Sequence, residues 1–290
     1  MLRVTLIALT LISALLAETA RAETPTGSNA DTRVVVSLQV KPEAAQQWLT
    51  GPWQVNPAPS GPAQGANAVL VFVDQHLVVD ADGKPAGSGV NRILALVVPG
   101  KHRGTGETAS VVARLFSADP AYVPSPYKNA VPGQIRRERI VRESNTEPAS
   151  GREMWTVRDS AGGVVELAFD YTGGLPARSK SESKVYSAVE PTFFRIYRVE
   201  QGADVVKSVP ANIDRVQNFK LTIGIQELRK IFDGSEKVVS RHHDPVVFPP
   251  GLGTLGAAGV GDAVGLTASP TMPAPTATPG RASYSPPAEI

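Results

Sequence analysis

The chain has 290 residues, of which 29 are Lys or Arg and 27 are Asp or Glu, and it contains no cysteine. The formal net charge of +2 argues against binding of nucleic acid by bulk electrostatics. The absence of cysteine excludes disulfides and thiolate chemistry, and the length is sufficient for one large β domain with a buried core.

The N-terminus has the three parts of a cleavable export signal. Arg3 supplies positive charge, an apolar run covers 4–17, and Ala20-Arg21-Ala22 is a small-x-small cleavage pattern. The run is shorter than the roughly 20 apolar residues of a spanning helix, so a retained anchor is the less favoured alternative. We predict a signal peptide at 1–22, a periplasmic or secreted protein, and no stable membrane insertion.

The first half of the remaining chain predicts strands separated by turns. Residues 23–32 are polar and are expected to form a flexible leader, and Pro42 is expected to begin a short helix. Asp80 to Gly83 have the composition of a tight turn. The β-branched and apolar segments expected to be strands are 33–40, 68–73, 76–79, 91–98 and 109–116.

The second half begins with a proline-rich segment at 119–133, which is expected to be an irregular loop. A second helix is expected at 225–232 because its apolar residues fall on one side. Residues 251–290 are rich in Gly, Ala, Pro, Thr and Ser and predict a disordered tail. The expected strands are 134–142, 153–157, 164–170, 185–188, 192–201, 205–209, 219–223 and 238–248.

The pattern of many short strands with Gly/Pro turns favours one mainly β domain at 33–250, built as a barrel or a sandwich. We predict an antiparallel, closed or partly closed β-barrel with a few short helices. A small-molecule ligand or substrate is the expected partner. Nucleic acid is not expected, and the oligomeric state is left open.

Two groups of possible metal ligands are explained more simply by local backbone structure. Asp80 and Asp82 resemble the start of a calcium loop, but the later ligands of such a loop are missing, so a hairpin turn is favoured. His242 and His243 are adjacent on an expected strand and therefore point to opposite faces. We predict neither a metal nor a cofactor.

Arginines on two expected strands are candidates for ligand binding. Arg137 and Arg139 share one face of the strand at 134–142, and a buried arginine needs a carboxylate or an anionic ligand. The alternative is an exposed edge strand whose charges oppose aggregation. Arg195 and Tyr197 share a face with Phe193, which predicts either a cavity for a planar or acidic molecule or ordinary core packing.

The order of these segments resembles the acetoacetate decarboxylase family over roughly residues 34–250. The resemblance rests on the strand order and on Gly151-Arg152-Glu153, which is similar to the family's Gly-Arg-Glu segment. It implies a barrel around an apolar cavity and a lysine that forms a Schiff base with a β-keto acid. Such a lysine is activated by burial beside a second cation, which lowers its pKa.

The resemblance implies candidate site residues at three positions. Arg152 and Glu153 are expected to line the cavity, with Glu153 as an acid or base; a surface ion pair is the alternative. The family's two lysines after Gly-Arg-Glu are replaced here by Thr156-Val157-Arg158. Lys128 is the remaining candidate nucleophile, with a solvated loop lysine as the alternative.

Two main functions follow from these expectations. The first is a non-enzymatic barrel that binds a small apolar or weakly acidic molecule outside the cytosol. The second is a lyase of the decarboxylase type, acting on a β-keto acid or related carbonyl compound through a Schiff-base lysine. A weaker third possibility is an envelope interaction protein tethered by its tail.

Overall fold

The computed structural model describes residues 24–123 and 127–246. The predicted signal peptide at 1–22 and the predicted tail at 251–290 lie outside this part of the chain. Within it, no helix has both the length and the apolar character needed to cross a membrane. The described residues are mainly β, as the sequence predicts.

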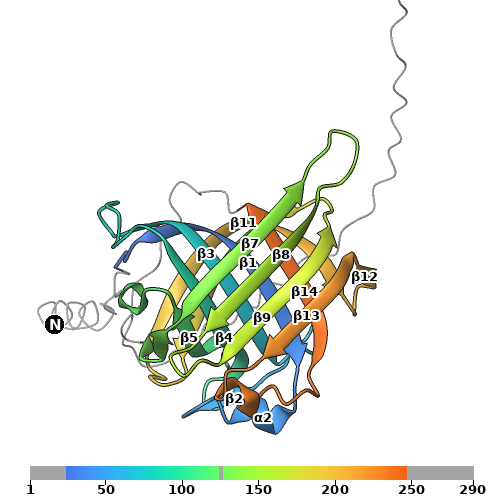
Figure 1. The fold of residues 1–290 in the computed structure, drawn as a ribbon. Helices are drawn as coiled ribbons and strands as arrows, with labels where there is room; N and C mark the ends of the chain where they lie inside the picture. The colour runs from blue at the N-terminus through green and yellow to red at the C-terminus, as the bar shows by residue number, and fades with distance from the viewer. Residues whose placement is uncertain (1–23, 124–126, 247–290) are drawn as a thin grey trace, which may run out of the picture.

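Seven strands form a closed barrel (Figure 1). Strand β5 pairs with both of its neighbours in the ring, and these pairings complete the closure. Four of the wall strands listed below, β1, β3, β4 and β5, are rich in Val, Ile and Leu, which suit a pleated sheet covered on both faces. Around the barrel the order is β4 (Asn91–His102), β3 (Ala68–Val79), β1 (Ser28–Gln39), β14 (Lys237–Val246), β11 (Phe194–Ser208), β10 (Ala177–Ser187) and β5 (Thr108–Ser117).

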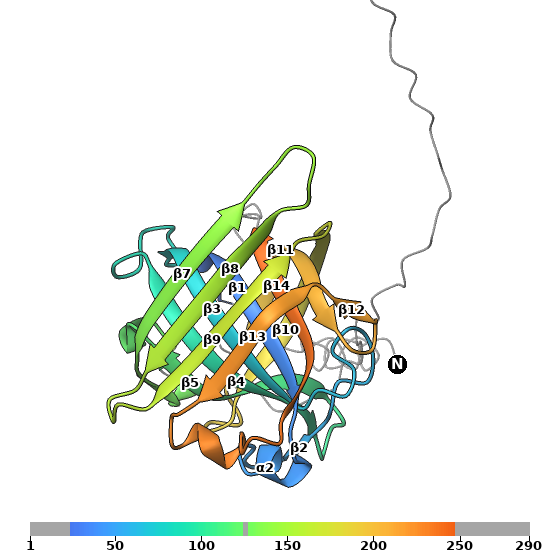
Figure 2. The ribbon, with the colours of Figure 1, turned by 45° about the vertical axis from the view of Figure 1, so that its right-hand side comes forward.

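A second, four-stranded sheet lies across the barrel wall formed by β3, β1 and β14 (Figures 1 and 2). Its strands are all antiparallel, and β7 is an edge strand. This placement agrees with the edge-strand interpretation of the arginine-rich segment. The order of the sheet is β13 (Val216–Ile223), β9 (Val164–Thr172), β8 (Ser150–Arg158) and β7 (Gln134–Arg142).

The remaining elements are short and connect or extend the two sheets. The predicted first helix is confirmed, and proline occupies its first position, where a missing N–H is tolerated. These elements are α2 (Pro42–Gln46), β2 (Trp53–Val55), η1 (Pro120–Tyr122), β6 (Ala130–Pro132), β12 (Ile213–Asp214) and η3 (Leu228–Lys230).

The main hydrophobic core lies between the barrel wall and the four-stranded sheet. The rings of Phe72 on β3 and Trp155 on β8 meet at a centroid distance of 5.6 Å. Leu70, Leu94 and Leu167 are also fully buried in this core. A barrel of about this strand number is wide enough inside for side chains or one small ligand, but not for a second sheet. The four-stranded sheet therefore covers the barrel from outside, and the opposite face of the wall lines the interior.

A second, smaller apolar cluster lies on this inner face. It contains Tyr127 and Phe193, whose rings meet edge to face at 4.9 Å. The segment predicted as an irregular loop thus sends one aromatic side chain into the barrel. Alternation along the strands separates the two clusters: Leu70 and Phe72 face the sheet, whereas Val71 between them faces inward.

The turn predicted at Asp80 to Gly83 is confirmed. The Asp80 carboxylate accepts hydrogen bonds from the backbone N–H groups of Asp82 and Lys84. Gly83 has a φ of 80°, a conformation that glycine adopts without steric cost. The two aspartates therefore serve the turn of the β3–β4 hairpin.

The prediction of a strictly antiparallel barrel is wrong, because the barrel is mixed. Strand β10 runs parallel to β5, and Val185, Tyr186 and Ser187 pair with residues 110–112. The chain leaves the barrel after β5 and forms three strands of the outer sheet. It then re-enters the barrel as β10, in the direction of β5. A parallel pairing needs such a long connection.

The predicted helix at 225–232 is also wrong. Only Leu228–Lys230 forms a helical turn, of the 3₁₀ type. Ile225, Leu228 and Ile231 are all buried, and a spacing of three places them on one face of a helix with three residues per turn. Strand boundaries differ too: β1 begins at Ser28 rather than at residue 33, and β11 is continuous where two strands were expected.

Candidate functional site

A polar group inside the barrel contains two of the sequence-predicted residues. Arg195 and Tyr197 lie on β11, and strand alternation places both on the inner face with Val185 of β10. Tyr127, which sequence reasoning did not select, joins them from the loop before β6. Its hydroxyl lies 3.5 Å from that of Tyr197. These three residues are called the inner polar group below.

Tyr127 is held in place by the barrel wall. It is 2% exposed, and its hydroxyl donates a hydrogen bond of 3.0 Å to the Val185 carbonyl. Its own carbonyl accepts a 2.7 Å hydrogen bond from the Ser187 hydroxyl. Burial raises the pKa of Tyr127 well above its usual value, the nearby Tyr197 adds to this rise, and the positive charge of Arg195 opposes it. Tyr127 is therefore a neutral phenol at physiological pH.

Arg195 contributes a positive charge with unused hydrogen-bonding capacity. Its Nε is buried and has no hydrogen-bond partner among the described residues. A buried donor without a partner is costly, and a bound carboxylate would satisfy it. The surrounding wall is apolar and only partly buried, which leaves accessible surface on the inner face. Its members include Val71, Ile93, Val97 and Val185.

The predicted nucleophile Lys128 does not join this group. Its side chain is 61% exposed, and its Nζ lies 3.0 Å from a carboxylate oxygen of Glu190. Lys128 has a φ of 52°, so the chain turns sharply after Tyr127. The hydrogen bond from Lys128 is the main reason that the pKa of Glu190 lies below its usual value. Lys128 is therefore surrounded by solvent, as the alternative interpretation of a solvated loop lysine expects.

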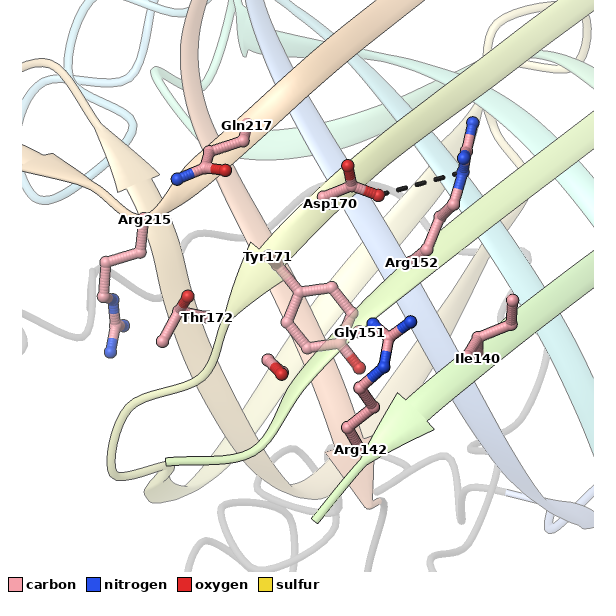
Figure 3. A pocket seen from close by; sticks show the side chains of 10 residues that line it. Ile140, Arg142, Gly151, Arg152, Asp170, Tyr171, Thr172, Arg215 and Gln217 are labelled. Carbon is pink, nitrogen blue, oxygen red and sulfur yellow. Dashed lines mark ion pairs between the residues drawn. The ribbon is translucent and has the colours of Figure 1, made fainter. Parts of the chain in front are cut away.

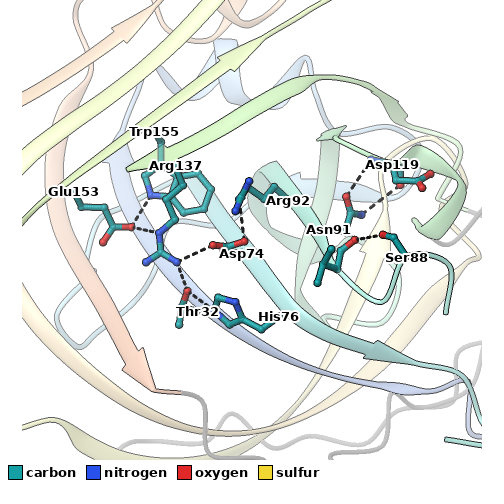
Figure 4. Close-up of polar contacts among 11 residues, drawn as sticks. Thr32, Asp74, His76, Ser88, Asn91, Arg92, Asp119, Arg137, Glu153 and Trp155 are labelled. Atoms are coloured by element: carbon teal, nitrogen blue, oxygen red, sulfur yellow. Dashed lines mark hydrogen bonds and ion pairs between the residues drawn. The ribbon is translucent and has the colours of Figure 1, made fainter. Parts of the chain in front are cut away.

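Arg137 and Glu153, predicted separately, form a buried ion pair between the outer sheet and the barrel (Figure 4). Arg137 Nε lies 2.9 Å from Glu153 Oε1, which also accepts a 2.7 Å hydrogen bond from Trp155 Nε1. The Arg137 guanidinium is 3.1 Å from Asp74 of β3 and also contacts Thr32 of β1. These contacts join the two layers, and Glu153 is fully buried.

Two further arginines lie near this pair. Arg139 is half-buried and lies opposite Glu153 in the register of β7 and β8. Its Nε is buried and has no hydrogen-bond partner in the described chain. Arg241 on β14 is fully buried against the Phe169 ring. Burial lowers the pKa of Arg241, and the negative charge of Glu153 opposes this effect. Sequence reasoning missed Arg241 because its neighbours, His242 and His243, were examined only as metal ligands.

Strand alternation separates Arg152 from Glu153. Arg152 points to the outer face of the sheet, is 55% exposed, and lies 3.8 Å from Asp170. There it lines an open pocket of about 410 Å³ with Arg142, Tyr171 and Arg215 (Figure 3). The two neighbours implied by the family resemblance therefore lie on opposite faces of the sheet, and neither belongs to the inner polar group.

The described residues contain no group of three or more His, Asp or Glu side chains arranged to hold a metal ion. His242 pairs with Val35 and Val205 in the barrel wall. Burial lowers the pKa of His242, which favours the neutral ring. Asp204, whose charge opposes this shift, is itself paired with Arg215.

Comparison with solved structures identifies the fold. The enduracididine biosynthesis enzyme MppR in complex with pyruvate superposes with a TM-score of 0.51 and 15% identity, over 83% of this chain and 90% of MppR. An acetoacetate decarboxylase-like enzyme from Sphingomonas wittichii RW1 gives 0.50 and 14% identity, over 79% of this chain and 92% of that one. The sequence itself matches no family model and no curated protein.

A second MppR complex leads to the same fold. It holds the condensation product of pyruvate and imidazole 4-carboxaldehyde, and it superposes with a TM-score of 0.50 and 15% identity. The predicted resemblance to acetoacetate decarboxylases is thus confirmed at the level of the fold. Identities this low carry no information about individual site residues.

Proposed function

Since the chain has an acetoacetate decarboxylase-like fold, we propose that it is an exported protein that binds a small organic acid inside its barrel. The ligand carboxylate contacts Arg195, and the apolar wall takes the remainder of the molecule. The observation that carries this proposal is the buried, unpartnered Nε of Arg195 beside two tyrosine hydroxyls.

The chemistry of the inner polar group supports a carboxylate ligand. An arginine fork binds a carboxylate through charge-assisted hydrogen bonds, which are stronger than neutral ones. The Tyr197 hydroxyl can donate to a second oxygen, and ligand sites of this kind are mostly apolar with few polar groups. MppR, a solved structure of the same fold, holds pyruvate, which is a small carboxylate.

The positions of the lysines favour binding over Schiff-base catalysis. Every lysine of the sequence lies in the described residues, and all but Lys207 are exposed. Lys207 is half-buried and forms an ion pair with Asp214. A Schiff-base lysine needs burial beside another cation to lose its proton at neutral pH. Incubation with acetoacetate and borohydride should therefore leave every lysine unlabelled, and a labelled lysine would favour the lyase instead.

Thermal unfolding of the exported chain with increasing pyruvate tests the proposal. Pyruvate should raise the melting temperature, since a ligand at 100 times its Kd stabilises the folded state by about 2.7 kcal/mol. The neutral methyl ester of pyruvate should raise it much less, because it lacks the charge that Arg195 recognises. Arg195→Gln should remove most of the difference between acid and ester.

Arg198→Gln is the matched control. Arg198 lies on the same strand with its side chain on the other face, where it pairs with Glu182. This variant should respond to pyruvate like the unmodified chain. Equal stabilisation by acid and ester, or equal loss in both arginine variants, would contradict carboxylate binding inside the barrel.

A further inference from the structure

The outer face of the four-stranded sheet carries a second, separate pocket. It lies where β7 ends and where β8 and β13 begin (Figure 3). Its volume of about 410 Å³ is within the usual range for small-molecule sites. Arg142, Arg152 and Arg215 line it together with one acid, Asp170. The lining residues carry three positive charges and one negative charge, and Asp204, which pairs with Arg215 from outside the lining, adds a second negative charge.

The arginines of this pocket are incompletely neutralised. Arg142 makes no ion pair or side-chain hydrogen bond within the described residues. Arg152 is 3.8 Å from Asp170, a carboxylate that also accepts a hydrogen bond from Asn218. Arg215 is anchored to Asp204, yet its Nε is buried and has no partner in the described part of the chain. Each guanidinium therefore retains donors for a further acceptor.

The floor of the pocket is fixed by close packing at Gly151. A Cβ on this residue would lie 2.4 Å from the Ile140 carbonyl oxygen and 2.8 Å from the Tyr171 hydroxyl. The lack of a side chain thus lets the Tyr171 side chain pack directly against the β8 backbone at Gly151 (Figure 3). The hydroxyl groups of Ser150 and Thr172 also line the pocket. They supply neutral donors beside the arginines.

We propose that this pocket binds a phosphomonoester group, with the Arg142 guanidinium as its main contact and Arg152 and Arg215 as flanking positive charges (Figure 3). A phosphomonoester carries a charge of about −1.5 to −2 near neutral pH, so it is attracted more strongly to an arginine-lined pocket than a monocarboxylate is. Its three terminal oxygens also suit several arginine forks at once. This site is on the opposite side of the sheet from the barrel, so it does not depend on the proposed barrel ligand.

Calorimetric titration of the full chain with phenyl phosphate at low ionic strength tests this proposal. Binding should be saturable, and benzoate, a monoanion of similar size, should bind at least about tenfold more weakly because it offers fewer charge-assisted bonds. Arg142→Gln should weaken phenyl phosphate binding about tenfold or more. The affinity of Arg142→Lys for phenyl phosphate should lie between those of the unmodified chain and Arg142→Gln, because lysine retains the charge but lacks the two-pronged guanidinium.

Arg158→Gln is the matched control for surface charge. Arg158 is exposed on the same face of the same sheet, at the opposite end of β8. Arg158→Gln should leave the affinity for phenyl phosphate unchanged, and so should Arg195→Gln inside the barrel. Absence of saturable binding, equal weakening by Arg142→Gln and Arg158→Gln, or equal affinity for benzoate would overturn the proposal.

Discussion

At the scale of single residues, the buried charge of Glu153 has the clearest consequence for stability. It is the nearest counter-ion of Arg137, at 2.9 Å, and its charge also acts on the fully buried Arg241. Loss of the Glu153 charge would leave Arg137 with Asp74 as its remaining carboxylate partner and would remove the negative charge that acts on the buried Arg241. The position suits a counter-ion that joins the outer sheet to the barrel.

Glu153→Gln should therefore lower the free energy of unfolding by about 3 kcal/mol or more, measured by urea denaturation at neutral pH. Glu138→Gln on the outer face of β7 is the control, because an exposed substitution of this kind changes stability by about 0.5 kcal/mol or less. A loss as small as that of the control would show that Glu153 carries no charge that Arg137 needs.

The sequence predicts these residues individually, but it does not predict their neighbours. Alternation along a strand is a local property, so Arg137 and Arg139 could be placed on one face before the structure was known. The groups around them come from strands distant in sequence: Asp74, which pairs with Arg137, lies on β3, and Arg241, on which the charge of Glu153 acts, lies on β14. Tyr127 was missed because a proline-rich loop carries no periodic pattern that indicates which side chain turns inward.

At the scale of elements, β8 depends on a glycine at its second position. Gly151 faces Tyr171 on β9 and Val141 on β7, and any side chain there would collide with backbone. The obstacle at 2.4 Å is the carbonyl oxygen of Ile140, which belongs to the ladder of an edge strand. Because the backbone of a paired strand moves less easily than a side chain, the strand must shift to accept even a methyl group.

Gly151→Ala should accordingly destabilise the protein by about 1–3 kcal/mol in urea denaturation, the usual cost of overpacking. Gly104→Ala provides the comparison. Its added Cβ would meet only the flexible side chain of His102, at 3.3 Å. The free energies of unfolding of the two variants should thus differ clearly. Equal values would mean that β8 and β7 separate at little cost in free energy.

The element between β13 and β14 shows where periodicity misleads. Apolar residues at 225, 228, 231 and 232 fit one face of an α-helix, and those at 225, 228 and 231 also fit one face of a 3₁₀ turn. The choice between the two helix types depends on the contacts that this segment makes with the rest of the protein. Phe232 is buried, and Asp233 immediately afterwards is tied to Lys41 near α2. Such tertiary constraints are not present in the local pattern.

At the scale of the whole molecule, composition and turn spacing are sufficient to predict a mainly β barrel or sandwich, and the family resemblance favours the barrel. They cannot predict the parallel pairing of β10 with β5, because it joins residues 110–112 to residues 185–187 through the outer sheet. Pairing between distant strands depends on how the intervening chain packs. Here that chain forms most of the four-stranded sheet, whose inner face completes the core.

This shared core leads to a prediction about cooperativity. One hydrophobic cluster contains residues of the barrel wall and of the outer sheet, so neither layer retains a complete core without the other. Elements that share one core unfold together in a single transition. Trp155 lies between the layers, whereas Trp53 packs on His102 and Tyr186 near the other end of the barrel. The two tryptophans therefore report on separate regions.

Two variants make the measurement: Trp48→Phe with Trp53→Phe retains Trp155, and Trp48→Phe with Trp155→Phe retains Trp53. In each variant, the urea midpoint from tryptophan fluorescence should equal the midpoint from far-ultraviolet circular dichroism of the same sample. Comparing two probes within one variant removes the effect of the substitutions on stability. If Trp155 fluorescence changed at lower urea than the dichroism while Trp53 fluorescence did not, the outer sheet would separate before the barrel unfolds, and the layers would be independent.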